Sequence, residues 1–308
     1  MTRFLVTGAS GLLGLNFGMQ MAAQYDVVGV VNQNALTGTP FQILQKDLSQ
    51  PDVVRAVLES TRPDVVIHCA AMANIDACEN HPKLAMRVNA DVPGEFAKIT
   101  RQMDIKLVHI STDAVFDGLV GNYIESDTPN PLSVYAKSKL AGEEIVAAMN
   151  PDAIIARVNF YGWSLKGKRS LSEFFFNHLS FGKPMMGFTD VYFCPLMVND
   201  LVEILVEMVA ADLKGIYHTL SSESLTKYQF GCAIAKRFGY DEHLVEPVSV
   251  FDSGLLAARS PNLTLSTQKL AQALGHTLPD QQHGLERLFA LYQQGYVEKI
   301  HAFDSAAG

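Results

Sequence analysis

The 308-residue sequence has few of the features that mark several common protein classes. It contains only four cysteines and no Cys-x-x-Cys pair, which argues against a disulfide framework. Its histidines and cysteines lack the spacing of zinc ligands, so no metal site is predicted. No apolar run reaches the roughly 20 residues that span a bilayer, and the first residues do not form a secretory signal. We therefore expect a cytoplasmic protein with no membrane partner.

Positive charge is also scarce, because 24 Lys and Arg residues stand against 32 Asp and Glu residues, a formal net charge of −8. Such a chain lacks the broad basic surface that nucleic acids need, so nucleic acid is not an expected partner. The hydrophobic content of 48% is instead typical of a folded protein with a large core.

Short apolar runs alternate with longer helical patterns over the first half of the chain. The runs carry few charges, as strands do when helices cover both faces of a parallel sheet. Strands are expected at 4–7, 27–31, 65–68, 106–110 and 154–157, and helices near 12–24, 52–59, 83–103 and 135–148. The alternation predicts an α/β fold with a doubly wound parallel sheet of the Rossmann type.

The alternation loosens after about residue 158. We expect a dinucleotide-binding domain over residues 1–158 and a smaller α/β substrate-binding part over 159–308, some of whose elements return to the sheet. Within that second part the sequence predicts an exposed loop over 162–169, helices over 172–179 and 226–238, and a strand over 216–220.

The first predicted strand runs directly into a Gly-x-x-Gly-x-x-Gly turn that opens a helix. Such a turn lets backbone NH groups approach a pyrophosphate at the helix N-terminus, where the helix dipole favours negative charge. A plain tight turn is the alternative. The context predicts a nucleotide cofactor that is bound by Gly8, Ser10, Gly11, Leu12 and Leu13.

The end of the second strand bears on the choice of cofactor. NAD enzymes of this fold usually place an acid there, but this chain has Asn32, Gln33 and Asn34. NADP is therefore favoured, although no Arg or Lys stands in that stretch to meet a 2′-phosphate, and NAD stays open. Asp47 with Leu48 could cap the adenine, or could be an ordinary helix entry.

Two further groups of residues could carry chemistry. Tyr135 and Lys139 lie four positions apart at the start of a predicted helix and so share one face. A nearby ammonium favours the phenolate, so we expect the pKa of Tyr135 to fall towards working pH for acid–base catalysis. Thr112, flanked by Ser111 and Asp113, follows a strand at the sheet edge where ligands bind. Its hydroxyl could donate a hydrogen bond to a substrate carbonyl, although these residues also form good turns.

Together these segments resemble the extended short-chain dehydrogenase/reductases, and most closely their dTDP-4-dehydrorhamnose reductase branch. The matching segments are the glycine turn, Ala70-Ala71, Val88-Asn89-Ala90, 111–118 and 135–143. The resemblance implies that Thr112, Tyr135 and Lys139 are catalytic. It also implies that the reaction is the NAD(P)H reduction of a keto group on a nucleotide-linked sugar, and it allows a homodimer.

The resemblance also implies which residues line the site. The further cofactor-binding residues are Cys69, Ala70, Ala71, Asn89, Ser111 and Asn159, and the substrate-binding residues are Thr112, Asp113, Ala114, Val115, Phe160, Trp163 and Arg259. Phe160 and Trp163 could stack on a base or sugar, with core packing as the alternative. Ala114 stands where the family usually has Tyr, and 157–160 reads Arg-Val-Asn-Phe instead of Arg-Thr-Ser-Trp, so the substrate is expected to differ.

The C-terminal half also resembles the regulatory beta subunit of methionine adenosyltransferase. The similar segments are 215–218, 226–228, 259–262 and 269–270. This second resemblance implies an alternative function, an NADP-binding regulatory or scaffold protein in which Tyr135 and Lys139 only hold the cofactor.

Overall fold

The structure is a computed structural model that describes residues 1–252 and 260–304. Its centre is a seven-stranded parallel sheet in the order β11-β6-β5-β4-β1-β2-β3. The strands are β1 (Arg3–Thr7), β2 (Asp26–Val31), β3 (Gln42–Gln45), β4 (Val65–His68), β5 (Lys106–Thr112), β6 (Ile154–Val158) and β11 (Gly215–Thr219). The predicted doubly wound α/β fold is confirmed. The sequence analysis missed β3, because this short edge strand has glutamine at both ends and shows no apolar run.

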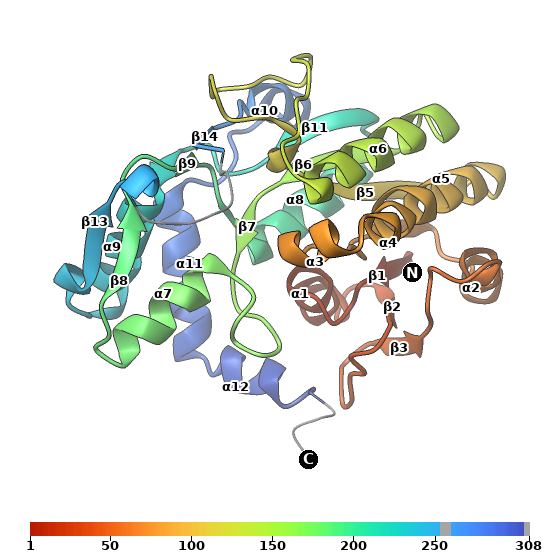
Figure 1. Ribbon diagram of the computed structural model, residues 1–308. Helices are drawn as coiled ribbons and strands as arrows, with labels where there is room; N and C mark the ends of the chain where they lie inside the picture. Colours follow the sequence, from red (N-terminus) through yellow and green to blue (C-terminus); the bar gives the residue numbers. More distant parts are fainter. Residues whose placement is uncertain (253–259, 305–308) are drawn as a thin grey trace.

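Helices cover both faces of the sheet (Figure 1). On one face α1 (Leu12–Met21) packs against α8 (Val198–Ala210), and on the other lie α2 (Val53–Thr61), α5 (Val92–Gln102) and α6 (Val134–Met149). Alternate residues of each strand supply the two cores, because successive side chains point to opposite faces. In β1, Phe4 and Val6 join the core under α1, whereas Leu5 joins the other core.

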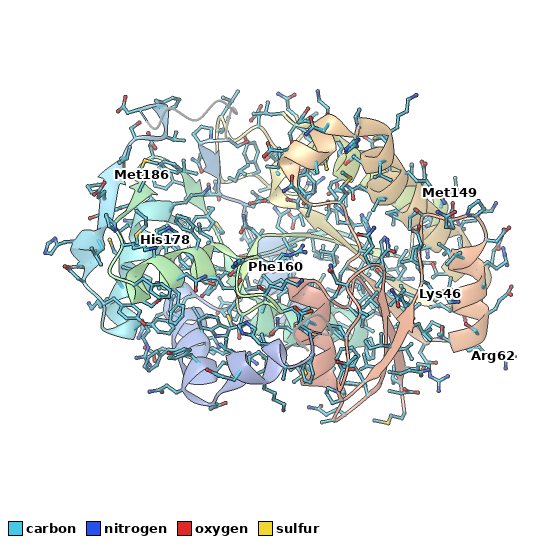
Figure 2. All side chains as sticks on the ribbon, turned by 60° about the horizontal axis from the view of Figure 1, so that its bottom comes forward. Lys46, Arg62, Met149, Phe160, His178 and Met186 are labelled. Carbon is cyan, nitrogen blue, oxygen red and sulfur yellow. The ribbon has the colours of Figure 1, made fainter. Side chains whose placement is uncertain are left out.

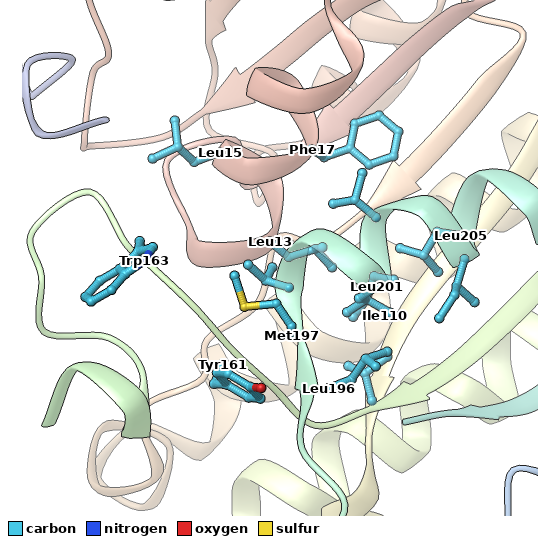
Figure 3. Close-up of a cluster of buried hydrophobic side chains, with 14 of the residues drawn as sticks. Leu13, Leu15, Phe17, Ile110, Tyr161, Trp163, Leu196, Met197, Leu201 and Leu205 are labelled. Atoms are coloured by element: carbon cyan, nitrogen blue, oxygen red, sulfur yellow. The ribbon is translucent and has the colours of Figure 1, made fainter. Parts of the chain in front are cut away.

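The core between α1 and α8 comes from helical spacing in both helices. Figure 3 shows Leu13 and Phe17 of α1 near Leu201 and Leu205 of α8. In each helix these residues are four positions apart and therefore lie on one face. Glu203 of α8 lies on the exposed side, so this apolar helix is amphipathic. No helix in the described ranges is both long and apolar enough to cross a membrane.

A smaller group of elements from the second half of the chain lies beside the sheet. Its helices are α7 (Leu171–Ser180), α9 (Lys227–Phe238), α10 (Gln268–Leu274), α11 (Gln281–Gln293) and α12 (Tyr296–His301). Its short strands are β7 (Phe160–Tyr161), β8 (Met185–Phe188), β9 (Tyr192–Phe193), β10 (Leu196–Met197), β12 (Leu225–Thr226), β13 (Val245–Val248) and β14 (Asn262–Leu263). In Figure 1, α7, α9, β8 and β13 are on the left and α10 is at the top next to β11. Both α8 and β11 come from this half of the chain yet belong to the sheet layers. The division after residue 158 stays a prediction.

Two stretches differ from the expected pattern. The predicted helix over 83–103 is divided into α4 (Pro82–Met86), a π-helical turn (Arg87–Asp91) and α5, and it follows the short α3 (Ile75–Asn80). The loop over 162–169 was expected to be exposed, but its first half, through Leu165, is buried. Aromatic packing draws that half inward, as described below for Trp163.

Candidate active site

The glycine turn joins β1 to α1 as predicted. Gly8 has a φ of +67°, and a Cβ at this position would come within 2.9 Å of the Ala70 nitrogen. At Gly14 an added Cβ would lie 2.5 Å from the Gly8 carbonyl oxygen. No described side chain caps the first turn of α1, which follows Gly11. The NH groups at this helix end can therefore bind an anionic group such as a pyrophosphate.

Thr7, the last residue of β1, connects the turn to the end of β4. Its hydroxyl accepts a hydrogen bond from the Ala70 nitrogen at 3.0 Å and pairs with His68 Nδ1 at 2.8 Å. The predicted cofactor segment Cys69–Ala71 therefore lies against Gly8, where an added Cβ would meet the backbones of both Cys69 and Ala70. Burial, with a smaller effect of the Lys139 charge, lowers the pKa of His68 to about 3. His68 is therefore a neutral residue of the core.

Thr112 and Tyr135 come together at the carboxyl end of β5, as the sequence predicts, and Lys139 contacts the backbone of the same strand. The Ser133 side chain caps α6, which places Tyr135 in the first turn of the helix and Lys139 one turn later. The Thr112 hydroxyl lies close enough to the Tyr135 phenol to oppose the effect of burial on its pKa. Lys139 Nζ donates a hydrogen bond to the Ile110 carbonyl oxygen at 2.6 Å. Residues far apart along the chain thus form one cluster at the sheet edge.

The pKa of Tyr135 moves in the opposite direction to the one we expected. Burial raises the pKa of this phenol to about 12, and the Thr112 hydroxyl opposes the rise. Burial also lowers the pKa of Lys139 to about 8, opposed by the negative charge of Glu143. The expected lowering of the Tyr135 pKa is therefore wrong, because burial of the phenol is the largest effect on its pKa and the nearby acid Asp113 raises it further. At neutral pH Tyr135 keeps its proton.

Asp113 and Asn159 form a pair beside Thr112. Asn159 Nδ2 donates a hydrogen bond to Asp113 Oδ2 at 2.7 Å, and the Thr112 hydroxyl donates to Asp113 Oδ1 at 3.1 Å. Burial raises the pKa of Asp113 to about 6, against the lowering effect of these two hydrogen bonds. The predicted cofactor residue Asn159 therefore contacts a predicted substrate residue, and the pair forms one wall of the cluster.

Asn89 is fully buried in the π-helical turn, and both ends of its carboxamide contact protein groups. Its Oδ1 accepts a hydrogen bond from the Met72 nitrogen at 2.8 Å, and its Nδ2 donates to the Met72 carbonyl at 3.0 Å and to Ser138 Oγ at 2.9 Å. The Ser138 hydroxyl in turn donates to the Tyr135 carbonyl at 2.8 Å. Asn89 thus ties the segment after β4 to the first turn of α6.

The sequence analysis missed a buried ion pair below this cluster. Arg157 Nη2 lies 2.8 Å from Glu143 Oε2, and each side chain is only 2% exposed. Arg157 Nε also donates to both carboxylate oxygens at 3.1 Å. Ser111 Oγ donates to Glu143 Oε1 at 2.5 Å, so this predicted cofactor residue has a protein partner instead. An arginine inside an otherwise apolar strand was the available signal, because a buried charge needs a partner.

Several other predicted residues lie outside this cluster. Asn32 is exposed after β2, and the Asp47 carboxylate accepts hydrogen bonds from its neighbours Ser49 and Gln50. Leu48 and Val115 are buried in hydrophobic cores. Ala114 is half-buried in the 3₁₀ turn Asp113–Val115, and Phe160 is half-buried in β7 (Figure 2).

Trp163 lies in an aromatic cluster of the C-terminal part. Its indole Nε1 donates a hydrogen bond to the Leu288 carbonyl at 3.0 Å, and its ring contacts Phe176 and Tyr292. The ring is 2% exposed, so of the two alternatives the structure shows core packing and does not bring Trp163 to the cluster. Arg259 lies outside the described residues.

Comparison with known proteins gives close relatives. The family model described as RmlD substrate binding domain matches residues 2–294. The chain is 33% identical over 296 residues to a probable low-salt glycan biosynthesis reductase, Agl14, of Haloferax volcanii, covering 93% of this chain and 98% of the relative. It is also 33% identical over 282 residues to methionine adenosyltransferase 2 subunit beta of Bos taurus, covering 87% of this chain and 81% of the relative.

Solved structures agree with the fold. The dTDP-4-dehydrorhamnose reductase of Bacillus anthracis in complex with NADP superposes with a TM-score of 0.82 at 27% identity, over 94% of this chain and 99% of that chain. The dTDP-4-dehydrorhamnose reductase of Clostridium acetobutylicum gives a TM-score of 0.80 at 25% identity, over 95% of this chain and all of the other.

Proposed function

The chain belongs to the RmlD substrate binding domain family, and from this premise we propose that it is an NADPH-dependent reductase of a keto group on a nucleotide-linked sugar. The similarity to the glycan biosynthesis reductase and to the dTDP-4-dehydrorhamnose reductases supports this proposal. Two parts of the carboxyl edge of the sheet match the needs of such a reaction. The glycine turn after β1 can bind a dinucleotide, and the residues at the end of β5 can carry out acid–base chemistry.

One observation carries the proposal: the chain folds so that Tyr135, in the first turn of α6, and Thr112, the last residue of β5, lie close enough for Thr112 to act on the phenol. Ligands of open α/β sheets bind beyond that end of the strands. A carbonyl oxygen placed between these two hydroxyl groups would receive a hydrogen bond from Tyr135, and one from Thr112 once that hydroxyl turns away from Asp113. Such donors stabilise the negative charge that develops on this oxygen.

The residues of the cluster have separate tasks in the proposed reaction. When bound, the nicotinamide supplies a hydride to the carbonyl carbon. Tyr135 donates its proton to the carbonyl oxygen and later regains one from water. A pKa of about 12 keeps that proton on Tyr135 until it is needed. Thr112 orients the carbonyl oxygen.

Two elements of the chain fit the cofactor. The NH groups at the start of α1 would bind the pyrophosphate. Glycine at position 8 lets the turn lie against the Ala70 backbone, which a Cβ at this position would approach to within 2.9 Å. The Lys139 ammonium has three hydrogen-bond donors, and one of them bonds to the Ile110 carbonyl. The other two can bind ribose hydroxyls. Its positive charge would stabilise the Tyr135 phenolate after proton transfer.

The substrate side of the site would be formed by Asp113, Ala114 and Phe160. Asp113 and its partner Asn159 offer hydrogen-bonding groups to sugar hydroxyls. Ala114 leaves more room than the tyrosine usual at this position, so we expect a sugar with a larger or differently placed substituent. A cytoplasmic location and a homodimer remain predictions.

Replacement of the proposed acid tests the function. We expect Tyr135→Phe to lower kcat by about 100-fold or more with a reducible 4-keto sugar nucleotide, because general acid catalysis contributes about 10² to 10⁴. Its NADPH affinity, measured by fluorescence titration, should stay near that of the wild type. The matched control is Tyr25→Phe. It removes a hydroxyl just before β2 (Asp26–Val31), at the amino ends of the strands and away from the proposed site. Wild-type turnover by Tyr135→Phe would exclude Tyr135 as the acid.

A second function has specific support in the methionine adenosyltransferase 2 subunit beta relatives and in Ala114. In that case the chain would bind NADPH and regulate a partner enzyme. A panel of keto-sugar nucleotides separates the two functions. Tight NADPH binding without oxidation by any member, together with a methionine adenosyltransferase that co-purifies, would favour the regulatory function.

A further inference from the structure

Lys46 follows β3 directly and lies beside the end of β2. The two strands pair in parallel, with Val31 opposite Gln45. The Lys46 nitrogen donates a hydrogen bond to the Val31 carbonyl at 2.8 Å, and the Gln45 side-chain amide donates to the Asn32 carbonyl at 2.9 Å. Figure 2 labels Lys46 at this end of the sheet. Lys46 and Asn32 are therefore neighbours, although the loop 33–41 and the whole of β3 separate them in the sequence.

The side chain of Lys46 is exposed, and within residues 1–252 and 260–304 its ammonium has no ion-pair partner. The nearest acid in the sequence, Asp47, is already engaged, because its carboxylate accepts hydrogen bonds from Ser49 Oγ at 2.6 Å and Gln50 Nε2 at 3.0 Å. On the other side stands Asn32, which carries no charge. Lys46 therefore supplies a positive charge at the sheet edge that no described carboxylate neutralises.

We propose that Lys46 binds the ribose 2′-phosphate of NADPH and gives this protein its preference for NADPH over NADH. The inference rests on the proposed function, because the adenosine ribose of a dinucleotide lies at the end of the second strand in this fold. NAD enzymes have an acid there that accepts from the 2′-hydroxyl and repels a phosphate. Here Asn32 removes the repulsion, and Lys46 offers a charge-assisted hydrogen bond.

This assignment adds a residue that the sequence analysis did not consider. The residues after β2 contain no Arg or Lys, so no group for a 2′-phosphate was evident there. The cation comes instead from the neighbouring strand. The parallel pairing of β2 with β3 brings it to the same edge, and β3 was itself missed in the sequence.

Equilibrium binding of NADPH and NADH to the whole chain tests the proposal. We expect Lys46→Ala to raise the Kd for NADPH about tenfold and to leave the Kd for NADH within about twofold, because one charge-assisted hydrogen bond is lost. Lys46→Glu should raise the NADPH Kd further, and Lys46→Arg should keep the preference. The matched control is Lys98→Ala, which removes the same charge from the exposed side of α5.

A smaller probe isolates the phosphate contact from the nicotinamide. Adenosine 2′,5′-bisphosphate should bind the wild type more tightly than AMP does, and Lys46→Ala should remove that difference. Equal weakening of NADPH and NADH, or an unchanged ratio of their Kd values, would overturn the role of Lys46. If the wild type binds neither dinucleotide, the proposed function fails and the inference fails with it. If the wild type prefers NADPH and Lys46→Ala keeps that preference, only the inference fails.

Discussion

Two stretches of the same sheet edge are built in opposite ways. Around the ends of β5 and β6, Thr112, Lys139, Glu143 and Arg157 are buried, and each has a protein partner. Around the ends of β2 and β3, Asn32 and Lys46 are exposed, and hydrogen bonds to their backbones hold the two segments together. The first stretch carries the proposed chemistry and the second the proposed choice of cofactor.

The difference follows from what each task needs. Stabilisation of a charge that develops during a reaction is strongest between groups shielded from water, because burial strengthens their electrostatic interactions. A phosphate needs only a cation within reach, which an exposed lysine provides at little cost in desolvation. Changes in the buried stretch should therefore lower stability, whereas changes in the exposed stretch should alter affinity alone.

The largest effect on stability is expected at the buried ion pair. Glu143→Leu leaves the Arg157 guanidinium buried without its carboxylate, so the free energy of unfolding should fall by about 3–5 kcal/mol. Urea unfolding, followed by circular dichroism, measures this change. The double variant Glu143→Leu with Arg157→Met should recover most of the loss, because it removes both charges. A loss below about 1 kcal/mol in the single variant would contradict the buried pair.

The second prediction concerns Asp113 and pH. The folded-state pKa of this acid is raised to about 6 from 3.8, so the folded chain binds more protons than the unfolded chain between these values. Its contribution to stability must therefore fall as pH rises from about 4 to about 7, by about 3 kcal/mol. Urea unfolding across this range should show that slope in the wild type relative to Asp113→Asn. Parallel curves for the two proteins would refute the shift.

The smallest effect on stability is expected in the exposed stretch. Asn32→Asp should change the free energy of unfolding by less than about 0.5 kcal/mol, as is usual for surface substitutions. The new carboxylate should nevertheless weaken NADPH binding and favour NADH, since it would repel a 2′-phosphate and accept from a 2′-hydroxyl. Kd values for both dinucleotides measure the change. A large loss of stability in Asn32→Asp, with no change in the preference for NADPH over NADH, would contradict the difference between the exposed and the buried stretch.

Much of the fold could be predicted because its signals are local. The apolar runs at β1, β2, β4, β5 and β6 are continuous, and the helical spacing between them is regular. β3 escaped prediction because it has only four residues and depends on β2 for its pairing. The buried start of the loop after β7 escaped for a similar reason, since distant aromatic residues cover Trp163.

The candidate site divides in the same way. The glycine turn and the pair Tyr135 and Lys139 were predicted, because their spacing within one turn or one helix determines their geometry. The partners of Glu143 and Arg157 were not, because three elements must pack before these charges meet.

The sequence by itself determined the strand–turn–helix that opens the chain and the shared face of Tyr135 and Lys139, since both depend on contacts within a few residues. Tertiary structure alone decided which charges are buried, that the pKa of Tyr135 rises instead of falling, and that Lys46 stands beside Asn32. The physical reason is that desolvation and strand pairing depend on segments distant in the chain, which no local pattern encodes.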